Sequence, residues 1–411
     1  MANTNAQGNI PNVSQHGYSS FRTDMFGRIK VSEPYTLFDS TNRYQRNSDF
    51  SEEIAGTGSV THLPNESTVS LNIGTASGDK ITYESKKVFP YQPGKSLQVM
   101  QTFVFAPAKT NLRQRAGYFS RENGIFLEQD GTNLYLVKRS YVTGQVVDTR
   151  VAQSNWNIDQ LNGDGPSDIV LDLTKGQLMW SEYEWLGVGT VRVGFAIDGY
   201  FIPVHKFDHA NLISSVYMTT ASLPLRYEIE NTGVTTSTSS MKQVCATVIS
   251  NGGYSHDESE IYSATRETEV TVGTTAYPLI AIRMKSGHTD SVVIPTFIDI
   301  VSGSAGQGVW SLIANPTSLT GGTWSTTNSS PNVEYSINMT AMEGGTVLRR
   351  KFFSTSNQSS GEYSSEDFAT WDIQLGRTNS ATPVSDIYVF SFRTFSGTMG
   401  IRSMLGWHDL L

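Results

Sequence analysis

Hydrophobic and polar positions alternate most clearly in residues 183–207. The odd positions from Val191 to Ile197 are apolar, and the even positions between them are Arg192, Gly194 and Ala196. Because successive side chains of a strand point to opposite faces, this period of two predicts a strand with one face on a core. Turn sequences flank it, and residues 201–207 predict a returning strand, so the stretch is typical of an antiparallel meander.

Short stretches of this kind recur through residues 45–252, with turn residues between them. Many short strands separated by turns are typical of a sandwich or barrel. The pattern predicts a concanavalin-like jelly-roll β-sandwich, with a short helical turn at 158–161. Its expected strands cover residues 67–73, 96–105, 124–128, 132–141, 146–151, 169–173, 179–185, 191–197, 201–207, 224–231 and 241–249.

A second all-β region follows a polar break. Residues 250–253 are Ser-Asn-Gly-Gly, a charged polar stretch follows them, and we predict a linker at residues 253–264. Residues 265–411 predict a smaller β-sandwich whose apolar carboxyl end is docked rather than free. Its expected strands cover residues 268–272, 277–284, 291–301, 309–314, 333–338, 347–353, 368–375 and 386–394.

Residues 1–44 differ from both of these regions. The first 20 residues are almost entirely polar, and apolar side chains become frequent between residues 21 and 44. We interpret residues 1–44 as an extended N-terminal arm that docks on a neighbouring subunit, on its own first domain, or on both. The alternative is that part of this stretch is only the first edge strand of the first domain. The residues predicted to dock on partners are Phe21, Met25, Phe26, Ile29, Val31, Tyr35, Phe38, Trp407, Leu410 and Leu411.

Composition narrows the class of protein. Charged residues make up 17% of the 411-residue chain, against about 25% in ordinary soluble domains. A net charge of −8 disfavours nucleic-acid binding, which needs a basic face. There is no apolar run of the ~20 residues that span a bilayer. The start lacks signal-peptide features and Cys245 is the single cysteine, so we expect synthesis in a reducing cytoplasm and burial of that thiol.

Three groups of polar residues were weighed as sites of chemistry. Glu182 and Glu184 share one strand face as in sandwich glycosidases, but Leu186 stands where a third acid is expected, so a solvated strand face is the alternative. His205 and His209 have a spacing that converges on metal only in a helix, which is not predicted here. Loop 162–168 has oxygen ligands for calcium but lacks the final glutamate of an EF-hand, and turns use the same residues.

Arginines beside aromatic residues form the remaining candidate. Arg113, Arg115 and Arg121 flank Tyr118 and Phe119 and could bind an anionic sugar or a carboxylate of a partner. Ion pairs within or between subunits are the alternative. No nucleotide-binding or nucleophile motif is present in the sequence, so we predict no catalytic residue, no metal site and no cofactor.

A set of short motifs is spread over residues 20–250. They are DMFGRIKVS (24–32), TLFDS (36–40), PYQPGKS (90–96), RQRAGYF (113–119), VDTRV (147–151), WLGVG (185–189), Asp198-Gly199 and residues 205–211. Together these motifs resemble a family of virion proteins of tailed bacteriophages, common in phages of marine bacteria and cyanobacteria. The resemblance does not extend beyond residue 255.

The resemblance implies a non-enzymatic structural protein of the virion: a fibre, spike, decoration or adaptor on head or tail. Its implied partners are other virion proteins and further copies of itself, a homotrimer by analogy, assembled in the host cytoplasm. The alternative function is a tailspike that binds or cleaves carbohydrate on the host surface, with the ligand on the concave face of the first sandwich. Neither function involves nucleic acid or membrane insertion.

Overall fold

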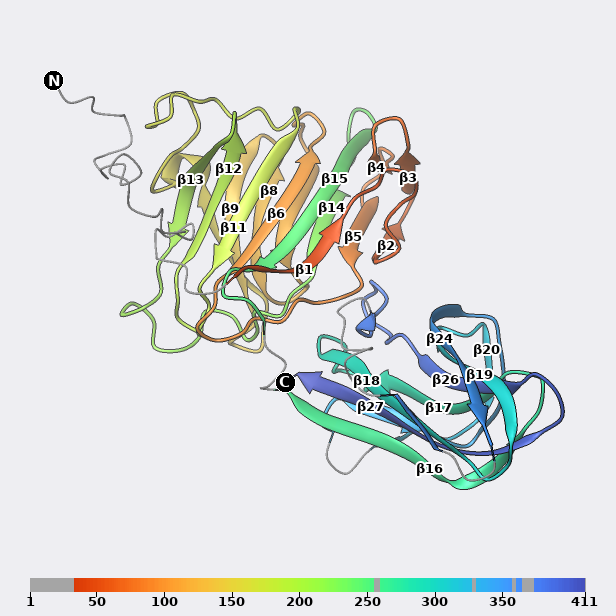
Figure 1. The fold of residues 1–411 in the computed structure, drawn as a ribbon. Helices are drawn as coiled ribbons and strands as arrows, with labels where there is room; N and C mark the ends of the chain where they lie inside the picture. The colour runs from red at the N-terminus through yellow and green to blue at the C-terminus, as the bar shows by residue number, and fades with distance from the viewer. Residues whose placement is uncertain (1–32, 255–258, 327–329, 357–359, 364–372, 411) are drawn as a thin grey trace, which may run out of the picture.

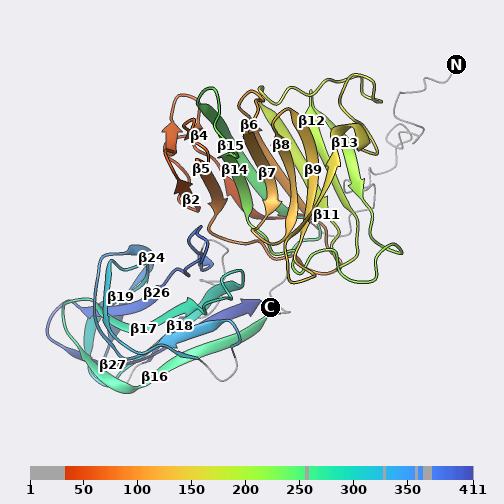
Figure 2. The same cartoon turned by 180° about the vertical axis from the view of Figure 1, so that it is seen from behind.

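The chain forms two all-β sandwiches in a computed structural model, which describes residues 33–254, 259–326, 330–356, 360–363 and 373–410. Figure 1 shows the two sandwiches one above the other, and Figure 2 shows them from behind. Helical structure in these ranges is limited to short 3-10 turns such as Gln153–Asn155. The predicted all-β fold class is therefore confirmed.

The first sandwich consists of an eight-stranded front sheet and a seven-stranded back sheet. The front sheet has the order β13-β12-β11-β6-β15-β4-β3, with β1 paired to β15, and the back sheet has the order β10-β9-β8-β7-β14-β5-β2. Front strands are β1 (Tyr35–Ser40), β3 (Ser59–Leu63), β4 (Thr68–Ile73), β6 (Leu97–Val104), β11 (Gln177–Tyr183), β12 (Val191–Ile197), β13 (Tyr200–Phe207) and β15 (Ser239–Ser250). Back strands are β2 (Phe50–Ala55), β5 (Lys80–Ser85), β7 (Leu112–Phe119), β8 (Gly124–Asp130), β9 (Asn133–Ser140), β10 (Val147–Ala152) and β14 (Leu225–Asn231).

The predicted meander is confirmed as β11, β12 and β13, which are antiparallel neighbours in the front sheet. The turn between β12 and β13 is Asp198-Gly199, with φ of 51° and 82°. Both residues are left-handed, as a two-residue hairpin turn that matches strand twist requires. Glycine and aspartate tolerate this conformation better than most residues.

Aromatic side chains join the two sheets in the core. The rings of Tyr118 on β7 and Tyr183 on β11 are 5.1 Å apart, and both side chains are fully buried. The Tyr118 hydroxyl donates to a backbone carbonyl and accepts from the backbone N–H of Leu223 at 3.0 Å. Its polar atom is thus satisfied inside an apolar layer, as burial of tyrosine requires.

The second sandwich has sheets of four, six and two strands. Their orders are β16-β27-β18-β25, β21-β22-β17-β26-β19-β24 and β20-β23. The strands are β16 (Glu260–Val272), β17 (Tyr277–Met284), β18 (Val292–Ser302), β19 (Gly306–Ala314), β20 (Ser318–Gly321), β21 (Ser325–Thr326), β22 (Val333–Ser336), β23 (Met339–Glu343), β24 (Thr346–Thr355), β25 (Ser360–Tyr363), β26 (Tyr388–Thr394) and β27 (Met399–Leu410).

Several predicted boundaries need correction. Strand β1 pairs with β15, so the first sandwich begins at residue 35 and not at 45, and the predicted arm is shorter. Strand β16 begins at Glu260, so the linker ends before residue 264. Residues 169–173 form a loop with one isolated bridge, and 158–161 are not helical. The strand predicted at 368–375 falls largely outside the described residues, and residues 373–375 are not in a strand.

One segment of the second sandwich lies against the first. In this interdomain segment, residues 373–386, Gln374 donates a side-chain hydrogen bond to the carbonyl of Val88 at 3.0 Å. The backbone N–H of Arg377 donates to the carbonyl of Lys86 at 3.0 Å, and Asn379 Nδ2 donates to the carbonyl of Thr82 at 2.9 Å. These bonds fix the segment against β5 and the residues that follow it, between the two sandwiches in Figure 1.

Candidate functional site

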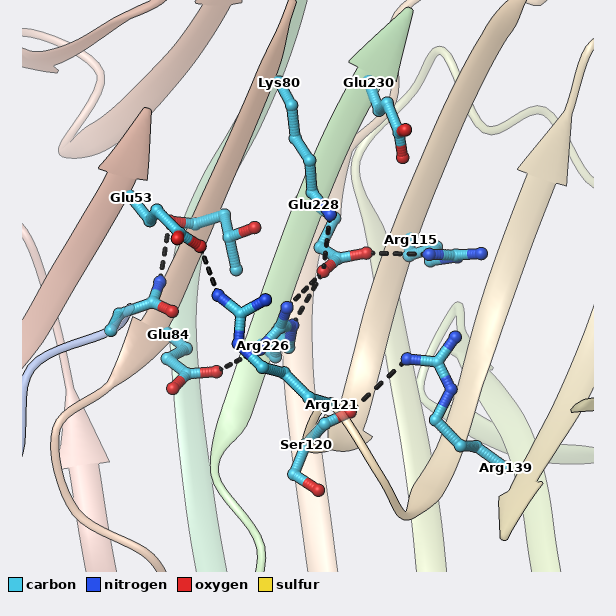
Figure 3. Close-up of polar contacts among 12 residues, drawn as sticks. Glu53, Lys80, Glu84, Arg115, Ser120, Arg121, Arg139, Arg226, Glu228 and Glu230 are labelled. Atoms are coloured by element: carbon cyan, nitrogen blue, oxygen red, sulfur yellow. Dashed lines mark hydrogen bonds and ion pairs between the residues drawn. The ribbon is translucent and has the colours of Figure 1, made fainter. Parts of the chain in front are cut away.

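The outward side of the back sheet carries a layer of charged residues. Strand β14 shows its origin, because Tyr227 and Ile229 point into the core while Arg226 and Glu228 point outward. The same alternation holds on the neighbouring strands. In Figure 3, dashed lines join Arg226 to Glu84 and Glu228, and Glu228 to Arg115. The charged face, as we name it, consists of Glu84, Arg115, Glu128, Arg139, Asp148, Arg150, Arg226 and Glu228.

Ion pairs of alternating sign link the charged face from strand to strand. Glu228 accepts from Arg226 and from Arg115 Nη1 at 2.9 Å, and Lys80 Nζ is 3.7 Å away. The pairs continue outward from both arginines: Arg226 binds Glu84 at 2.6 Å, and Arg115 binds Glu128 at 2.7 Å. Charge-assisted bonds of this kind are stronger than neutral ones and fix the geometry of both partners.

Aromatic rings form the floor of the charged face. Phe119, Phe126 and Val137 make a small buried cluster of their own on this side of the sheet. The guanidinium of Arg139 lies 5.0 Å from the ring centre of Phe126, and that of Arg226 lies 5.4 Å from that of Phe119. Stacking over aromatic rings is favourable for arginine. The arginines thus pack on aromatic rings and also form ion pairs with carboxylates of neighbouring strands. Together these contacts explain how charged groups are buried there.

Neighbouring positive charges lower the pKa of two carboxyl groups of the charged face, those of Glu228 and Asp148. Burial alone raises the pKa of Glu228, but the positive charges of Arg226, Lys80 and Arg115 outweigh it and hold that pKa well below its ordinary value. For Asp148, burial is likewise outweighed by the hydrogen bond and charge of Arg139, so its pKa is lowered. A general acid needs a raised pKa. Neither carboxyl group is therefore suited to donate a proton near neutral pH.

The three arginines predicted to bind a ligand all make ion pairs within the chain. Arg113 pairs with Glu230 at 2.8 Å, and Arg121 pairs with Glu53. Arg115 is buried between Glu128 and Glu228. The structure thus shows the alternative, in which these arginines form ion pairs within the chain. Of the three, only Arg115 belongs to the charged face.

The residues predicted to dock on partners separate into three groups. Phe21, Met25, Phe26, Ile29, Val31 and Leu411 lie outside the described residues. Tyr35 is exposed beside Tyr254, and Leu410 is half-buried at the end of β27. Phe38 and Trp407 are buried in the cores of their own sandwiches, which corrects their prediction as partner contacts. Sequence alone does not distinguish them, because a core and an interface both select apolar residues.

The other polar candidates are held by local hydrogen bonds. His205 Nδ1 accepts from the backbone N–H of Asn157 at 3.2 Å, and burial lowers the pKa of His205 to about 4. The ring of His209 stacks on Tyr217 at 3.8 Å. Among the described residues, no group of three or more His, Cys, Asp or Glu side chains could hold a metal ion. In the loop once considered for calcium, the side chain of Asn162 accepts from the N–H of Asp164 at 3.0 Å, as in an Asx turn.

A separate groove lies at the tip of the β12–β13 hairpin. It has a volume of about 490 Å³ and is lined on one side by Tyr200 and Phe201, which are 65% and 50% exposed. The opposite wall is the loop after residue 158. Asp159 fixes that wall, because its carboxylate accepts from the N–H groups of Leu161 and Ser167, both at 2.9 Å. Apolar walls with a few polar groups are typical of ligand pockets.

A second groove, of about 530 Å³, lies between the two sandwiches. Its lining is largely polar and includes Tyr91, Glu260, Asp290, Asn332 and Asp409. Asp409 is already bound there, because it accepts from Ser330 Oγ at 2.9 Å and from Asn332 Nδ2 at 2.8 Å. These hydrogen bonds fix the wall of the groove that the second sandwich provides.

Sequence reasoning missed most of the charged face. Glu84, Glu128, Arg226 and Glu228 were not singled out, although residues 226–230 alternate charged and apolar side chains. That alternation predicts a half-buried strand. It does not show that charged residues of six different strands meet, because pairing between strands is a property of the tertiary fold.

Comparisons with known proteins found likenesses in solved structures only. No protein-family model matches the chain, and no curated protein matches it. An endo-β-1,4-glucuronan lyase from Trichoderma reesei is similar over 52% of this chain and 95% of its own, at 11% identity and a TM-score of 0.35. The carbohydrate recognition domain of Emp47p is similar over 54% and 98%, at 11% identity and 0.35.

A phage protein is also among the similar structures. The CBM2 module of the evolved Dit of Lactobacillus casei BL23 phage J-1 is similar over 55% of this chain and 99% of its own, at 7% identity and a TM-score of 0.33. Identities and scores this low carry no statement about function. Separately, none of the helices in the described ranges is long and apolar enough to cross a membrane.

Proposed function

We propose that the chain is a non-enzymatic structural protein of a tailed-bacteriophage virion, a fibre, spike, decoration or adaptor that assembles as a homo-oligomer. The sequence resemblance over residues 20–250 first suggests this role. The observation that supports it most is the charged face. Every carboxylate of this face forms an ion pair with an arginine of the same chain. Such a surface stiffens a sandwich and offers no free acid or base.

The junction between the sandwiches fits the same role. Arg377 of the interdomain segment reaches Glu84 at 3.5 Å, which extends the ion pairs of the charged face into the second sandwich. The backbone bond from Arg377 to Lys86 and the side-chain bonds from Gln374 and Asn379 accompany it. A projecting particle component must transmit load between its domains, and a junction of this kind resists hinge motion better than a flexible linker does.

Removal of the N-terminal residues tests the anchoring role. A chain lacking residues 1–32 retains β1, whose Leu37 and Phe38 belong to the core, so it should fold. In cells infected by the phage that encodes the chain, we expect this truncation to stay out of purified particles while the full chain is incorporated. Comparable incorporation of both would contradict the proposal.

Binding of carbohydrate is the second candidate function, and the groove at the β12–β13 hairpin favours it. Tyr200 and Phe201 present exposed aromatic surface next to the carboxylate of Asp198, which is also exposed. Aromatic faces combined with polar groups suit a sugar ring, which has apolar faces and hydroxyl edges. The groove, not the charged face, is therefore where we place a glycan.

A glycan array and an assay for released reducing sugar separate the possibilities. Binding that is lost in Tyr200→Ala and Phe201→Ala, with no sugar released, supports a receptor-binding module. Release of sugar would indicate an enzyme. Absence of binding in the wild-type chain removes the second candidate and leaves the structural role as it stands.

A further inference from the structure

Two neighbouring loops at one end of the first sandwich expose a set of apolar side chains. One loop joins β11 to β12, and the other follows β13. Leu212 is 71% exposed and Leu186 is 55% exposed. The loop patch, as we name it, consists of Leu186, Val188, Leu212, Ile213 and Val216. Single exposed apolar residues are common, but a group on adjacent loops marks an interaction surface.

Hydrogen bonds hold the two loops together as one surface. The backbone N–H of Tyr217 donates to the carbonyl of Gly187 at 3.0 Å, and His209 Nδ1 is 2.7 Å from the carbonyl of Gly189. Leu186 has a φ of 38°, which is unusual for a bulky residue. Such a conformation persists only where the surroundings enforce it, and it is frequent at functional positions. The patch is therefore preformed.

The described chain starts at the same end of the front sheet. Tyr35 on β1 is opposite Ser250 on β15, Ser250 is opposite Leu97 on β6, and Leu97 is opposite Tyr183 on β11. Strand β11 ends at Tyr183, where the first loop of the patch begins. With neighbouring strands about 4.8 Å apart, β1 and β11 are separated by about 14 Å.

The segment that precedes residue 33 has the composition to cover the patch. Between residues 21 and 31 it carries Phe21, Met25, Phe26, Ile29 and Val31. Ile29 precedes Tyr35 by six residues and can reach about 20 Å from it when extended, and Phe21 can reach about 46 Å. The patch lies within this reach.

We propose that residues 21–31 bind the loop patch of their own chain. Apolar side chains from the segment cover apolar side chains of the loops, and the short tether keeps the segment at a high effective concentration. The inference goes beyond the proposed function and does not depend on a virion role. It assigns a docking surface to the predicted arm. The sequence alone leaves open whether that surface belongs to a neighbouring subunit or to the first domain of the same chain.

Limited trypsin digestion of the full-length protein tests the proposal. The segment contains Arg22, Arg28 and Lys30, whose cleavage can be followed by mass spectrometry. In Leu212→Ser/Ile213→Ser we expect cleavage at these sites at least tenfold faster than in the wild type. Phe26→Ser/Ile29→Ser changes the segment in place of the patch and should increase the cleavage rate by the same factor.

A matched control substitutes apolar residues that are as exposed but lie elsewhere. Val170 and Val234 are 70% and 71% exposed, outside the loop patch. Val170→Ser/Val234→Ser should be cleaved at the wild-type rate. Equal cleavage rates in the wild type and the Leu212→Ser/Ile213→Ser variant would overturn the proposal. Protection that disappears on dilution would also overturn it, because the contact would then be between chains.

Discussion

The charged face and the loop patch reverse the usual distribution of residues in opposite ways. On the charged face, Arg226 and Glu228 are nearly inaccessible although they form an ion pair. In the loop patch, Leu212 and Leu186 are exposed although they are apolar. Both regions belong to the first sandwich, so the difference is local and does not reflect a different fold.

The comparison shows which region is complete within the chain. Charged groups are buried only when partners compensate the loss of water, and each group of the charged face has such partners. Exposed leucines have no such compensation and gain free energy when another surface covers them. The charged face therefore stabilises the first sandwich by itself, whereas the loop patch needs a cover, the role that we propose for residues 21–31.

The largest expected effect follows from removal of Glu228. Glu228→Ala leaves Arg115, Arg226 and Lys80 without their shared anion, and we expect the free energy of unfolding to fall by about 3–5 kcal/mol. Urea denaturation followed by tryptophan fluorescence measures this. The matched control is Glu66→Ala, which breaks the exposed pair with Lys242 and should cost about 0.5 kcal/mol or less. Similar losses in both variants would contradict the assignment.

Acidification should weaken the first sandwich in two steps. His205 has a pKa of about 4 in the folded chain against an ordinary value of 6.5. Its contribution to stability is therefore lost as pH falls from 6.5 to 4, because the unfolded chain takes up a proton that the buried imidazole does not. Glu228 has a lowered pKa, so its contribution is full above about pH 4.5 and is lost below that value. We expect His205→Asn to reduce the loss of unfolding free energy in the upper window, by about 1–3 kcal/mol. An unchanged pH profile would contradict this.

Loss of a contact at the junction between the sandwiches should lower the free energy of unfolding by less than loss of Glu228. Asn379→Ala removes the side-chain bond to the buried carbonyl of Thr82, and we expect a loss of about 1–2 kcal/mol. Differential scanning calorimetry should show the two sandwiches melting further apart than in the wild type. Thr378→Ala is a suitable control, because its side chain bonds only within the segment, to Ser380 and Val384. A single unchanged transition in Asn379→Ala would argue against a fixed junction.

The smallest effect is expected in the loop patch. Leu212→Ser/Ile213→Ser changes exposed side chains that have little contact with the core, so the free energy of unfolding of a chain lacking residues 1–32 should change by about 0.5 kcal/mol or less. Urea denaturation of the two truncated chains measures this. A loss as large as that in Glu228→Ala would show that the patch is part of the core.

Strands β12 and β7 show where alternation along the sequence predicts a strand and where it does not. Strand β12 was predicted with its observed bounds, Val191–Ile197, because apolar and small or polar residues alternate without exception. Strand β7 was not predicted as a strand. Its inward positions include Gln114, which is buried through hydrogen bonds to Ala106, and its outward positions include the buried Phe119. The period of two is therefore hidden.

The wrongly predicted strand at residues 169–173 and the charged face that was missed have one cause in common. Residues 169–173 alternate like a strand, but Leu171 donates its N–H to Leu161 and Phe105 donates its N–H to Leu173, so the apolar residues anchor a loop. Likewise, the arginine cluster was noticed while its acidic partners on β8 and β14 were not. Contacts between distant segments decide both cases, and local patterns do not report them.

Hydrogen–deuterium exchange of the full chain and of a chain lacking residues 1–32 tests the contrast between the two regions most directly. We expect the truncation to exchange several-fold faster in residues 184–190 and 208–217, because the loop patch loses its cover. Strands β7, β8 and β14 should exchange at the same rate in both chains, because the charged face is complete without the segment. Unchanged exchange in the two loops, or faster exchange across the charged face, would contradict the contrast.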